Sequence, residues 1–359
     1  MPASEPVPDR AMSKVLPHAD KRGRATLRTI AVLSGVHVST VSRVLAPSAG
    51  EGVRAASNET AKRIRALAGS VGYTPNPHAR GLRTERSNVV GVLAPRISDM
   101  VFATIYEGIE EAAGLRGFTT FVANSRDDAE ERSARIEMFL SRRVDGVILG
   151  DSRITDEPFI GRLVERDMPF LLVSRRSGQW PAVTCDDHLG GRLAATHLLE
   201  LGHRVVGVIA GEPYASTGLD RTAGFLEAYA EAGCPIAPDL VVPCHFDVGG
   251  GGSAAATLLS RFPQPTALFA VNDFAAIGAI GSMRELGLSP GIDIALVGFN
   301  DVPLAAALPV SLTSIRSPMR EMGNIAAAQI LMGVAGRRME SIKLEPILVV
   351  RESSCRAAV

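Results

Sequence analysis

The stretch LRTIAVLSGVHVSTVSRVL, residues 27–45, has the pattern of two short helices joined by a tight turn. Ile30, Ala31 and Leu33 recur at the spacing that gives the first helix one apolar face. Gly35 stands at the turn, where a residue free of Cβ strain is needed. The second helix leaves short hydroxyls and an arginine outside its apolar stripe, and such side chains contact bases and phosphates. The stretch therefore predicts a DNA-binding helix-turn-helix, although periodicity alone also fits an ordinary helical hairpin.

Charge is distributed unevenly along the chain. The 359 residues hold 38 basic and 38 acidic side chains and are neutral overall. Residues 1–86 hold 14 Lys and Arg against 6 Asp and Glu, a net charge of +8, and the remainder holds 24 against 32, a net charge of −8. A basic head on an acidic body is expected where only the head meets a phosphate backbone and releases its counterions. The charge pattern therefore favours the DNA-binding interpretation.

Two more segments complete the basic head. Ser57 or Asn58 caps a predicted third helix. Residues 76–88, NPHARGLRTERSN, then predict a short basic helix that Asn76 can cap. Leu82 lies on one face of that short helix, which has no core of its own to join.

From Asn88 onward, apolar runs alternate with amphipathic stretches. Such alternation with continuous apolar strands predicts parallel sheets covered on both faces. About 270 residues exceed what one such core holds, so we expect two α/β subdomains with a cleft between them. The predicted strands are 89–94, 119–123, 146–149, 170–173, 205–209, 267–271 and 294–297, and the predicted helices are 104–116, 129–142, 190–201, 221–232 and 274–286.

Ligands of open α/β sheets bind beyond the carboxyl ends of the strands. Those ends are polar here and include two aromatic residues, which suits a small hydroxylated molecule. An aspartate at such an end can also be a simple helix cap, an alternative that applies to Asp186 and Asp301. Phe246 could likewise belong to the core. Arg221 at the start of a predicted helix opposes the helix dipole, so we expect an anionic or hydroxyl partner for it.

The order TL-x-x-I-A…GV-x-x-STVSRVL…S-x-E-T…GY-x-PN-x-x-AR-x-L-R resembles the headpiece and hinge of lac-repressor-type (LacI/GalR family) transcription regulators. The similarity runs from about Thr26 to the C-terminus. It implies a small all-α helix-turn-helix headpiece and a periplasmic-binding-protein-like α/β body of two subdomains with doubly wound parallel sheets. The expected domains are a disordered tail at 1–24, the helix-turn-helix domain at 25–75, a hinge at 76–87, and an effector-binding and dimerisation domain at 88–359, with crossings between its subdomains near residues 186, 314 and 345.

The resemblance also implies which residues contact DNA. In the family, the start of the second helix reads bases, several hydroxyls hold phosphates, and a hinge leucine opens a minor-groove step as a wedge. The matching residues are Thr26, Val38, Ser39, Thr40, Ser42, Arg43, Ser57, Asn76, Ala79 and Leu82.

Three departures from the family pattern affect the headpiece. His37 replaces a serine that usually caps the second helix, and Ala46 replaces a common asparagine. The loop 47–56 is longer than usual. Gly81 in the hinge helix costs about 1 kcal/mol relative to alanine, so we expect the hinge to order only on DNA.

Family positions place the effector contacts at Asp99, Phe102, Ser174, Arg221, Phe246, Asn272 and Asn300. Sugar-binding members commonly carry aspartate where this chain has Ser174 and Asn300, because a carboxylate accepts two sugar hydroxyls. Losing both carboxylates while keeping Arg221 makes the expected cleft more positive, although Asp99 and Asp273 act in the opposite direction. The expected effector is a sugar, sugar acid or sugar phosphate, and the charge favours the two acidic classes.

Other classes of protein fit less well. No stretch approaches the roughly 20 apolar residues of a membrane span. The four cysteines lack metal-ligand spacing and are expected to be reduced cytosolic thiols, so neither metal nor cofactor is expected. The glycine run 249–252 matches no nucleotide-binding motif and fits a flexible helix start. No HExxH or GxSxG motif occurs, and His203 fits a helix end, so an enzyme is not expected.

The sequence thus predicts a cytoplasmic, nucleoid-associated repressor of carbohydrate metabolism that an effector controls allosterically. One headpiece covers only one half-site, so a homodimer on a pseudo-palindromic double-stranded operator is expected. Helices 105–113 and 274–284 are candidates for the dimer surface, although their apolar residues also fit core packing. The alternative is a two-lobed solute-binding protein without a DNA role, which would need an export signal and would lack the headpiece.

Overall fold

The computed structural model describes residues 17–20, 23–45, 56–73, 86–155, 157–261 and 264–354. The chain divides into two units, Met1–Glu85 and Arg86–Val359, each considered by itself. Several sequence expectations fall outside the described residues: most of the tail 1–24, Ala46, the loop up to residue 55, the hinge residues Asn76, Ala79, Gly81 and Leu82, and Cys355.

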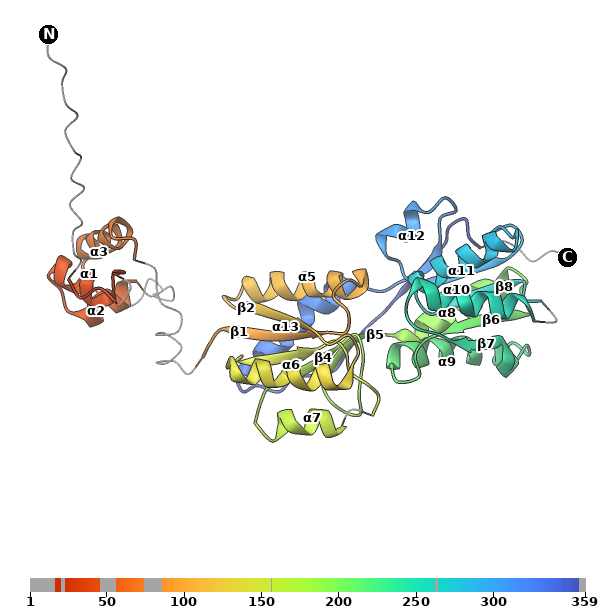
Figure 1. Ribbon diagram of the computed structural model, residues 1–359, viewed down its shortest axis with the longest axis horizontal. Helices are drawn as coiled ribbons and strands as arrows, with labels where there is room; N and C mark the ends of the chain where they lie inside the picture. Colours follow the sequence, from red (N-terminus) through yellow and green to blue (C-terminus); the bar gives the residue numbers. More distant parts are fainter. Residues whose placement is uncertain are drawn as a thin grey trace, which may run out of the picture. The chain divides into compact units, whose positions relative to one another are not determined.

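The first unit holds three short helices around a small apolar core, shown in red and orange in Figure 1: α1 (Leu27–Ser34), α2 (Val38–Val44) and α3 (Asn58–Ser70). Ile30, Val41 and Ile64, one from each helix, are fully buried together. Gly35 ends α1 with φ of 64°, the left-handed conformation that the predicted turn requires. The helix-turn-helix prediction is confirmed.

The buried face of α1 differs from the predicted one at one position. Ile30 and Ala31 are buried as expected, but Leu33 is 46% exposed. Ser34 is buried in its place, and Arg63 of α3 donates to the Ser34 carbonyl at 2.9 Å. Because α3 packs along the side of α1 that carries residues 30, 31 and 34, Leu33 faces away from the core.

The second unit contains two six-stranded sheets, each built as in a doubly wound fold. The strand order is β11-β5-β4-β3-β1-β2 in the first sheet and β12-β10-β9-β8-β6-β7 in the second. Every pairing is parallel except that of β10 with β12. The strands are β1 (Val89–Ala94), β2 (Thr119–Asn124), β3 (Gly146–Leu149), β4 (Phe170–Val173), β5 (Ala182–Cys185), β6 (Val206–Ala210), β7 (Val241–Pro243), β8 (Ala267–Ala270), β9 (Ala295–Asn300), β10 (Thr313–Arg316), β11 (Ile342–Leu344) and β12 (Ile347–Val349).

Helices cover both faces of each sheet (Figure 1). We call the first sheet with its helices the N-lobe and the second the C-lobe. In the N-lobe, α5 and α13 pack on one face and α6 and α7 on the other; in the C-lobe, α8 and α9 oppose α10 and α11. The helices are α5 (Met100–Gly114), α6 (Ala129–Ser141), α7 (Glu157–Val164), α8 (Asp187–Glu200), α9 (Ser216–Glu231), α10 (Val248–Leu259), α11 (Asp273–Glu285), α12 (Pro303–Ala307) and α13 (Met319–Val334). The predicted two-subdomain α/β body is confirmed.

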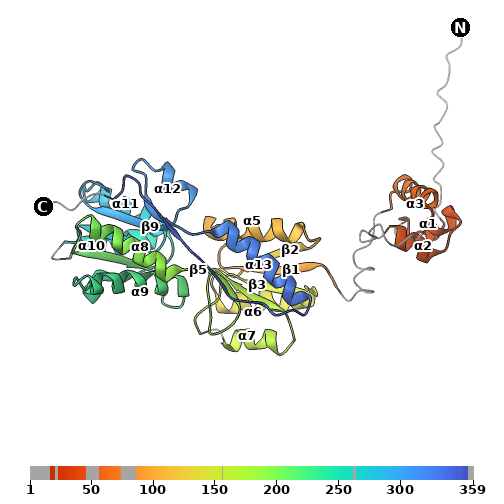
Figure 2. The ribbon, with the colours of Figure 1, turned by 180° about the vertical axis from the view of Figure 1, so that it is seen from behind.

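The chain passes between the lobes three times, and the dark blue C-terminal segments make two of these passages (Figure 2). β5 of the N-lobe ends at Cys185, and α8 of the C-lobe begins at Asp187. β11 ends at Leu344 in the N-lobe, and β12 begins at Ile347 in the C-lobe. The middle passage lies after Arg316, where β10 ends, a few residues later than the expected 314.

The helices expected at the dimer surface use their apolar residues within the protomer. In α5, Ile105 and Ile109 are fully buried, and Gly108 lies so close to α13 that an added Cβ would meet the Arg320 carbonyl at 2.3 Å. In α11, Ala275 and Met283 are fully buried. The core-packing alternative is therefore correct for these residues.

Candidate functional site

The exposed face of α2 carries the expected base-reading residues. Ser39 and Arg43 are exposed, and Val38, Thr40 and Ser42 are half-buried. The Arg43 Nε donates to the Ser39 carbonyl at 3.3 Å, which holds the arginine along the helix. The exposed face of α2 therefore presents a hydroxyl from its first turn, Ser39, beside a cationic side chain from its last turn, Arg43.

His37 does cap α2, although it replaces the usual serine. Its Nδ1 accepts from the Ser39 backbone N–H at 3.3 Å and lies 2.8 Å from the Ser39 hydroxyl. A neutral imidazole nitrogen supplies the acceptor that a hydroxyl supplies in other N-caps. The cap is thus retained, and the Ser39 hydroxyl has a protein partner.

Two expected phosphate contacts, Thr26 and Ser57, have local roles as N-caps. Thr26 forms a capping box with Thr29 at the start of α1, and its hydroxyl donates to the His18 carbonyl at 2.8 Å. Ser57 accepts from the Thr60 N–H at 3.2 Å at the start of α3. Both hydroxyls lie at helix N-termini, where backbone N–H groups also favour phosphate.

A cavity of about 480 Å³ lies at the carboxyl ends of the strands in the body, as expected for open α/β sheets. Both lobes contribute to its wall. All seven expected effector contacts line it, namely Asp99, Phe102, Ser174, Arg221, Phe246, Asn272 and Asn300. The structure therefore brings together residues that span two hundred positions in the sequence.

Three of these seven residues also have a structural role in the body. Asp99 caps α5 by accepting from the Val101 N–H at 2.9 Å, and burial raises the pKa of its carboxyl. Asn272 caps α11, with its Oδ1 2.7 Å from the Ala275 N–H. Phe102 is 2% exposed and forms an apolar wall.

Arg221 has its anionic partner inside the protein. Its Nε donates to Asp187 at 2.7 Å, its Nη1 donates to the Val271 carbonyl at 2.8 Å, and its guanidinium lies 3.8 Å from the ring centroid of Phe299. The sequence predicted that Arg221 begins a helix. This prediction is wrong, because α9 begins five residues earlier, at Ser216. Burial raises the pKa of Asp187 to about 6, although the arginine opposes this shift.

The cavity lining holds equal numbers of arginines and carboxylates. Four arginines and four carboxylates line it: Arg96, Arg126, Arg175 and Arg221, against Asp99, Asp127, Glu212 and Asp247. Arg175 donates to both Asp127 oxygens at 2.7 and 3.1 Å, and Arg221 is paired with Asp187. Arg221 therefore gives no reason to expect an acidic effector, because Asp187 already supplies its counter-charge.

Ser174 and Asn300 both adopt positive φ, 67° and 104°, at the ends of their strands. Non-glycine residues rarely adopt this conformation, and such strain clusters at binding sites. Asn300 is 3% exposed, and its buried Oδ1 has no hydrogen-bond partner among the described residues. Because Asn300 lines the cavity, this acceptor without a donor in the described part of the chain belongs to a residue of the cavity wall.

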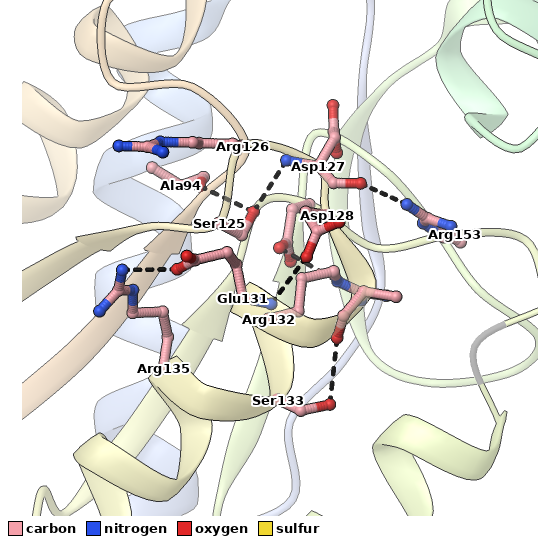
Figure 3. Close-up of polar contacts among 12 residues, drawn as sticks. Ala94, Ser125, Arg126, Asp127, Asp128, Glu131, Arg132, Ser133, Arg135 and Arg153 are labelled. Atoms are coloured by element: carbon pink, nitrogen blue, oxygen red, sulfur yellow. Dashed lines mark hydrogen bonds and ion pairs between the residues drawn. The ribbon is translucent and has the colours of Figure 1, made fainter.

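The loop after β2 is built around Asp127, which the sequence analysis did not select (Figure 3). Arg126 and Asp127 have φ of 58° and 57°, and the Ser125 hydroxyl donates to the Ala94 carbonyl at 3.1 Å. The Asp127 carbonyl accepts from Arg153, and its carboxylate accepts from Arg175. Asp127 thus ties the loop after β2 to the residues that follow β3 and β4.

The C-lobe contributes Tyr214 to the same region. The guanidinium carbons of Arg153 and Arg175 lie 4.7 and 5.8 Å from the Tyr214 ring centroid, and the Ile154 N–H donates to the Tyr214 carbonyl at 3.0 Å. Asp127 and Tyr214 follow their strands by three and four residues. A search of the loops beyond each strand end, rather than of the ends alone, would have found them.

The structural roles considered in the sequence analysis are correct for Asp186 and His203. Asp186 is a helix cap, because it accepts from the Leu189 N–H at 3.0 Å at the start of α8. Asp301 is not a cap, because Val302 is the N-cap residue of α12 and the Asp301 carboxylate forms ion pairs with Arg316 and Arg351. His203 is buried beyond the end of α8 beside the Thr266 hydroxyl. Phe246, in contrast, is half-buried and lines the cavity.

The described ranges hold neither a candidate metal cluster nor a candidate membrane-spanning helix. No group of three or more His, Cys, Asp or Glu side chains there could hold a metal ion. No helix in the described part of the chain is long and apolar enough to cross a bilayer.

The chain matches known regulatory proteins over both units. The family described as periplasmic binding proteins and sugar binding domain of LacI family matches residues 87–345, and the family of bacterial regulatory proteins, lacI family, matches residues 26–76. The HTH-type transcriptional regulator DegA of Bacillus subtilis (strain 168) is 30% identical over 337 residues, which cover 92% of this chain and 98% of DegA.

Two solved structures share the whole architecture. The lac repressor dimer bound to operator and the anti-inducer ONPF is 25% identical with a TM-score of 0.82, covering 92% of this chain and 99% of that one. The complex of the transcriptional regulator CelR with cellobiose is 30% identical with a TM-score of 0.70, covering 92% of this chain and all of that one. These relatives are transcription regulators and not enzymes. The chain belongs to the LacI family of DNA-binding transcription regulators, with a helix-turn-helix headpiece and a body that binds a small-molecule effector.

Proposed function

We propose that this regulator represses transcription as a homodimer on a pseudo-palindromic operator, and that a neutral, hydroxyl-rich molecule of the sugar class controls it. The unpartnered Oδ1 of Asn300 carries the proposal for the effector, because a buried acceptor is costly unless a donor reaches it. The balanced lining charge favours a neutral sugar over a sugar acid or sugar phosphate. The relative that binds cellobiose supports the same class.

The proposed effector contacts are the seven cavity residues expected from the sequence. Phe102 and Phe246 provide apolar walls for a sugar ring, and Ser174 and Asn300 provide its polar contacts. Arg221 contributes a guanidinium that Asp187 already neutralises, which suits hydroxyl acceptors rather than a phosphate.

The proposed DNA contacts are Val38, Ser39, Thr40, Ser42 and Arg43 on α2, together with Thr26, Ser57, Asn76, Ala79 and Leu82. The exposed Ser39 and Arg43 support base readout, and the helix-start positions of Thr26 and Ser57 support phosphate contacts. A headpiece over residues 25–75, a hinge over 76–87 and an effector-binding body over 88–359 complete the proposal. The lac repressor dimer on its operator supports the dimeric arrangement, and DNA binding implies action at the nucleoid in the cytoplasm.

A thermal-shift screen of the full chain tests the effector class. Neutral mono- and disaccharides, sugar acids, sugar phosphates and purines are compared, and the proposal expects stabilisation by a neutral sugar. Asn300→Ala should reduce that shift, whereas Ser282→Ala, which removes a hydroxyl on α11 that donates to the Gly252 carbonyl, should leave it unchanged. Stabilisation by sugar phosphates alone contradicts the proposed class.

A further inference from the structure

The end of β9 holds the proposed effector contact Asn300 in a strained backbone. Asn300 and the following Asp301 have φ of 104° and 56°. Two consecutive non-glycine residues in this region persist only where surrounding contacts hold them. The Asn300 side chain lines the cavity, so whatever holds this backbone also sets the position of its unpartnered Oδ1.

The carboxylate of Asp273, the first residue of α11, provides those contacts. Its Oδ2 accepts from the Val302 backbone N–H at 2.8 Å, and its Oδ1 accepts from the Ser314 hydroxyl at 2.6 Å. The Ser314 oxygen in turn accepts from the Asp301 N–H at 3.1 Å. A Cβ added at Gly298 would meet the Asp273 Oδ1 at 2.4 Å, so glycine at that position leaves room for the carboxylate.

Asp273 has no ion-pair partner among the described residues, although charged groups surround it. Arg221 from α9 is a charge that favours ionisation of Asp273, and it is already paired with Asp187 of α8. Asp301, on the link to α12, opposes ionisation and is itself paired with Arg316 of β10 and Arg351 beyond β12. Asp273 is fully buried, and this burial raises the pKa of its carboxyl to about 7.

We propose that Asp273 is a positioning residue, whose carboxylate fixes the backbone after Asn300 and thereby holds the Asn300 side chain in the effector cavity. Both Asp273 oxygens act as acceptors. A proton on Oδ2 opposes the Val302 N–H, and a proton on Oδ1 reverses the bond to the Ser314 hydroxyl, whose oxygen already accepts from the Asp301 N–H. The position of Asn300 therefore depends on the protonation of Asp273. This inference rests on the proposed function only in taking Asn300 as an effector contact.

The test follows Asn300 directly in the full chain without any ligand. The protein is labelled with [15N]asparagine, the Asn300 side-chain amide signal is assigned with Asn300→Ala, and wild type is compared with Asp273→Asn and Ser314→Ala. Ser282→Ala is the matched control, because it removes a C-lobe hydroxyl that does not touch residues 300–302. Hydrogen exchange of the segment 299–304 is measured on the same samples.

The proposal expects the Asn300 signal to move in Asp273→Asn and Ser314→Ala but not in the control. Exchange in the segment should rise about tenfold in both variants, the factor expected for losing a hydrogen bond to a carboxylate. Between pH 5.5 and 8.5 the wild-type signal should shift with a midpoint near 7, whereas Asp273→Asn should show no such shift.

An Asn300 signal that is unchanged in both variants, or a wild-type signal without a pH-dependent shift, overturns the proposal. If Asp273→Asn does not fold, Ser314→Ala and the wild-type titration decide the result. Because no effector is added, failure of the sugar screen leaves this measurement intact. The two proposals therefore fail separately.

Discussion

Arg176 of the N-lobe and Asp220 of the C-lobe form a bidentate ion pair, with Nε and Nη2 3.0 and 2.7 Å from the two carboxylate oxygens. The Arg176 backbone N–H also donates to the Ser216 hydroxyl at 2.9 Å. Arg153 and Tyr214 meet across the same boundary. These contacts join the lobes in addition to the three chain crossings, so opening of the cavity on this side requires them to break.

A double-mutant cycle on Arg176→Ala and Asp220→Ala should give a coupling energy of about 0.5–1 kcal/mol, because the pair is partly exposed. Arg192 and Glu231 form the matched control, a bidentate pair within the C-lobe at 3.0 and 2.6 Å. Hydrogen exchange of residues 212–220 should rise in Asp220→Ala but not in Glu231→Ala. Equal protection in both variants contradicts a role of the Arg176 pair in closing the lobes.

Replacement of Arg43 by alanine should relax the sequence preference of DNA binding, because this exposed side chain lies on the proposed base-reading face of α2. Arg65→Ala on α3 is the control, since it removes an equally exposed cation from the same unit. At fixed salt, both variants should lose about the same nonspecific affinity, and only Arg43→Ala should alter the motif recovered by DNA selection. An unaltered motif in Arg43→Ala would contradict the assignment of α2 as the reading helix.

His37→Ala should destabilise the headpiece by about 1 kcal/mol, the usual effect of losing an N-cap, whereas His37→Ser should retain most of that stability. Chemical denaturation monitored by circular dichroism at 222 nm measures both variants against wild type. If His37→Ala unfolds at the same denaturant concentration as wild type, the imidazole does not act as a cap.

Stability should depend on pH through Asp273. Its carboxyl pKa is about 7 when folded and 3.8 without the burial, so the folded state binds the proton more tightly. The stability that this group contributes is full below about pH 4 and declines as the pH rises to 7. Asp273→Asn removes the titrating group, so between pH 5 and 8 wild type should lose about 3 kcal/mol more stability than this variant loses. A difference in melting temperature that does not vary with pH contradicts the raised pKa.

Strands made entirely of buried apolar residues, such as β3 and β4, could be predicted from the sequence, whereas strands of three residues, such as β7, and the largely polar β10 could not. All seven predicted strands occur within two residues of their expected starts. Five strands were not predicted: β7, β11 and β12 have only three residues each and are not fully buried, and β5 and β10 mix polar residues with apolar ones. Helix α10 begins with a glycine run that suggested only a flexible helix start, because its close packing on α11 is a tertiary effect: a Cβ on Gly251 would meet the Ala275 Cα at 2.3 Å.

The cavity residues could be predicted, but their partners could not. Polar residues at strand ends and family positions sufficed to place Asn272 and Asn300 in one cavity. The pairing of Arg221 with Asp187 joins two helices through side chains 34 positions apart, and sequence periodicity carries no information on such a contact. The sequence therefore did not indicate that the Arg221 charge is already balanced inside the protein.

Occupancy of the cavity should change the affinity of the regulator for DNA, which a titration of the full chain measures. The affinity of the full chain for a selected pseudo-palindromic duplex is measured at one salt concentration, with and without the neutral sugar that stabilises the protein most. In wild type, the sugar should change the DNA affinity at least about fivefold, the lower end of typical allosteric coupling. In Asn300→Ala, the sugar should not change the DNA affinity, and the affinity without sugar should equal that of wild type. Equal DNA affinity with the cavity saturated, or the same sugar response in Asn300→Ala, would contradict the proposed coupling of the cavity to DNA binding.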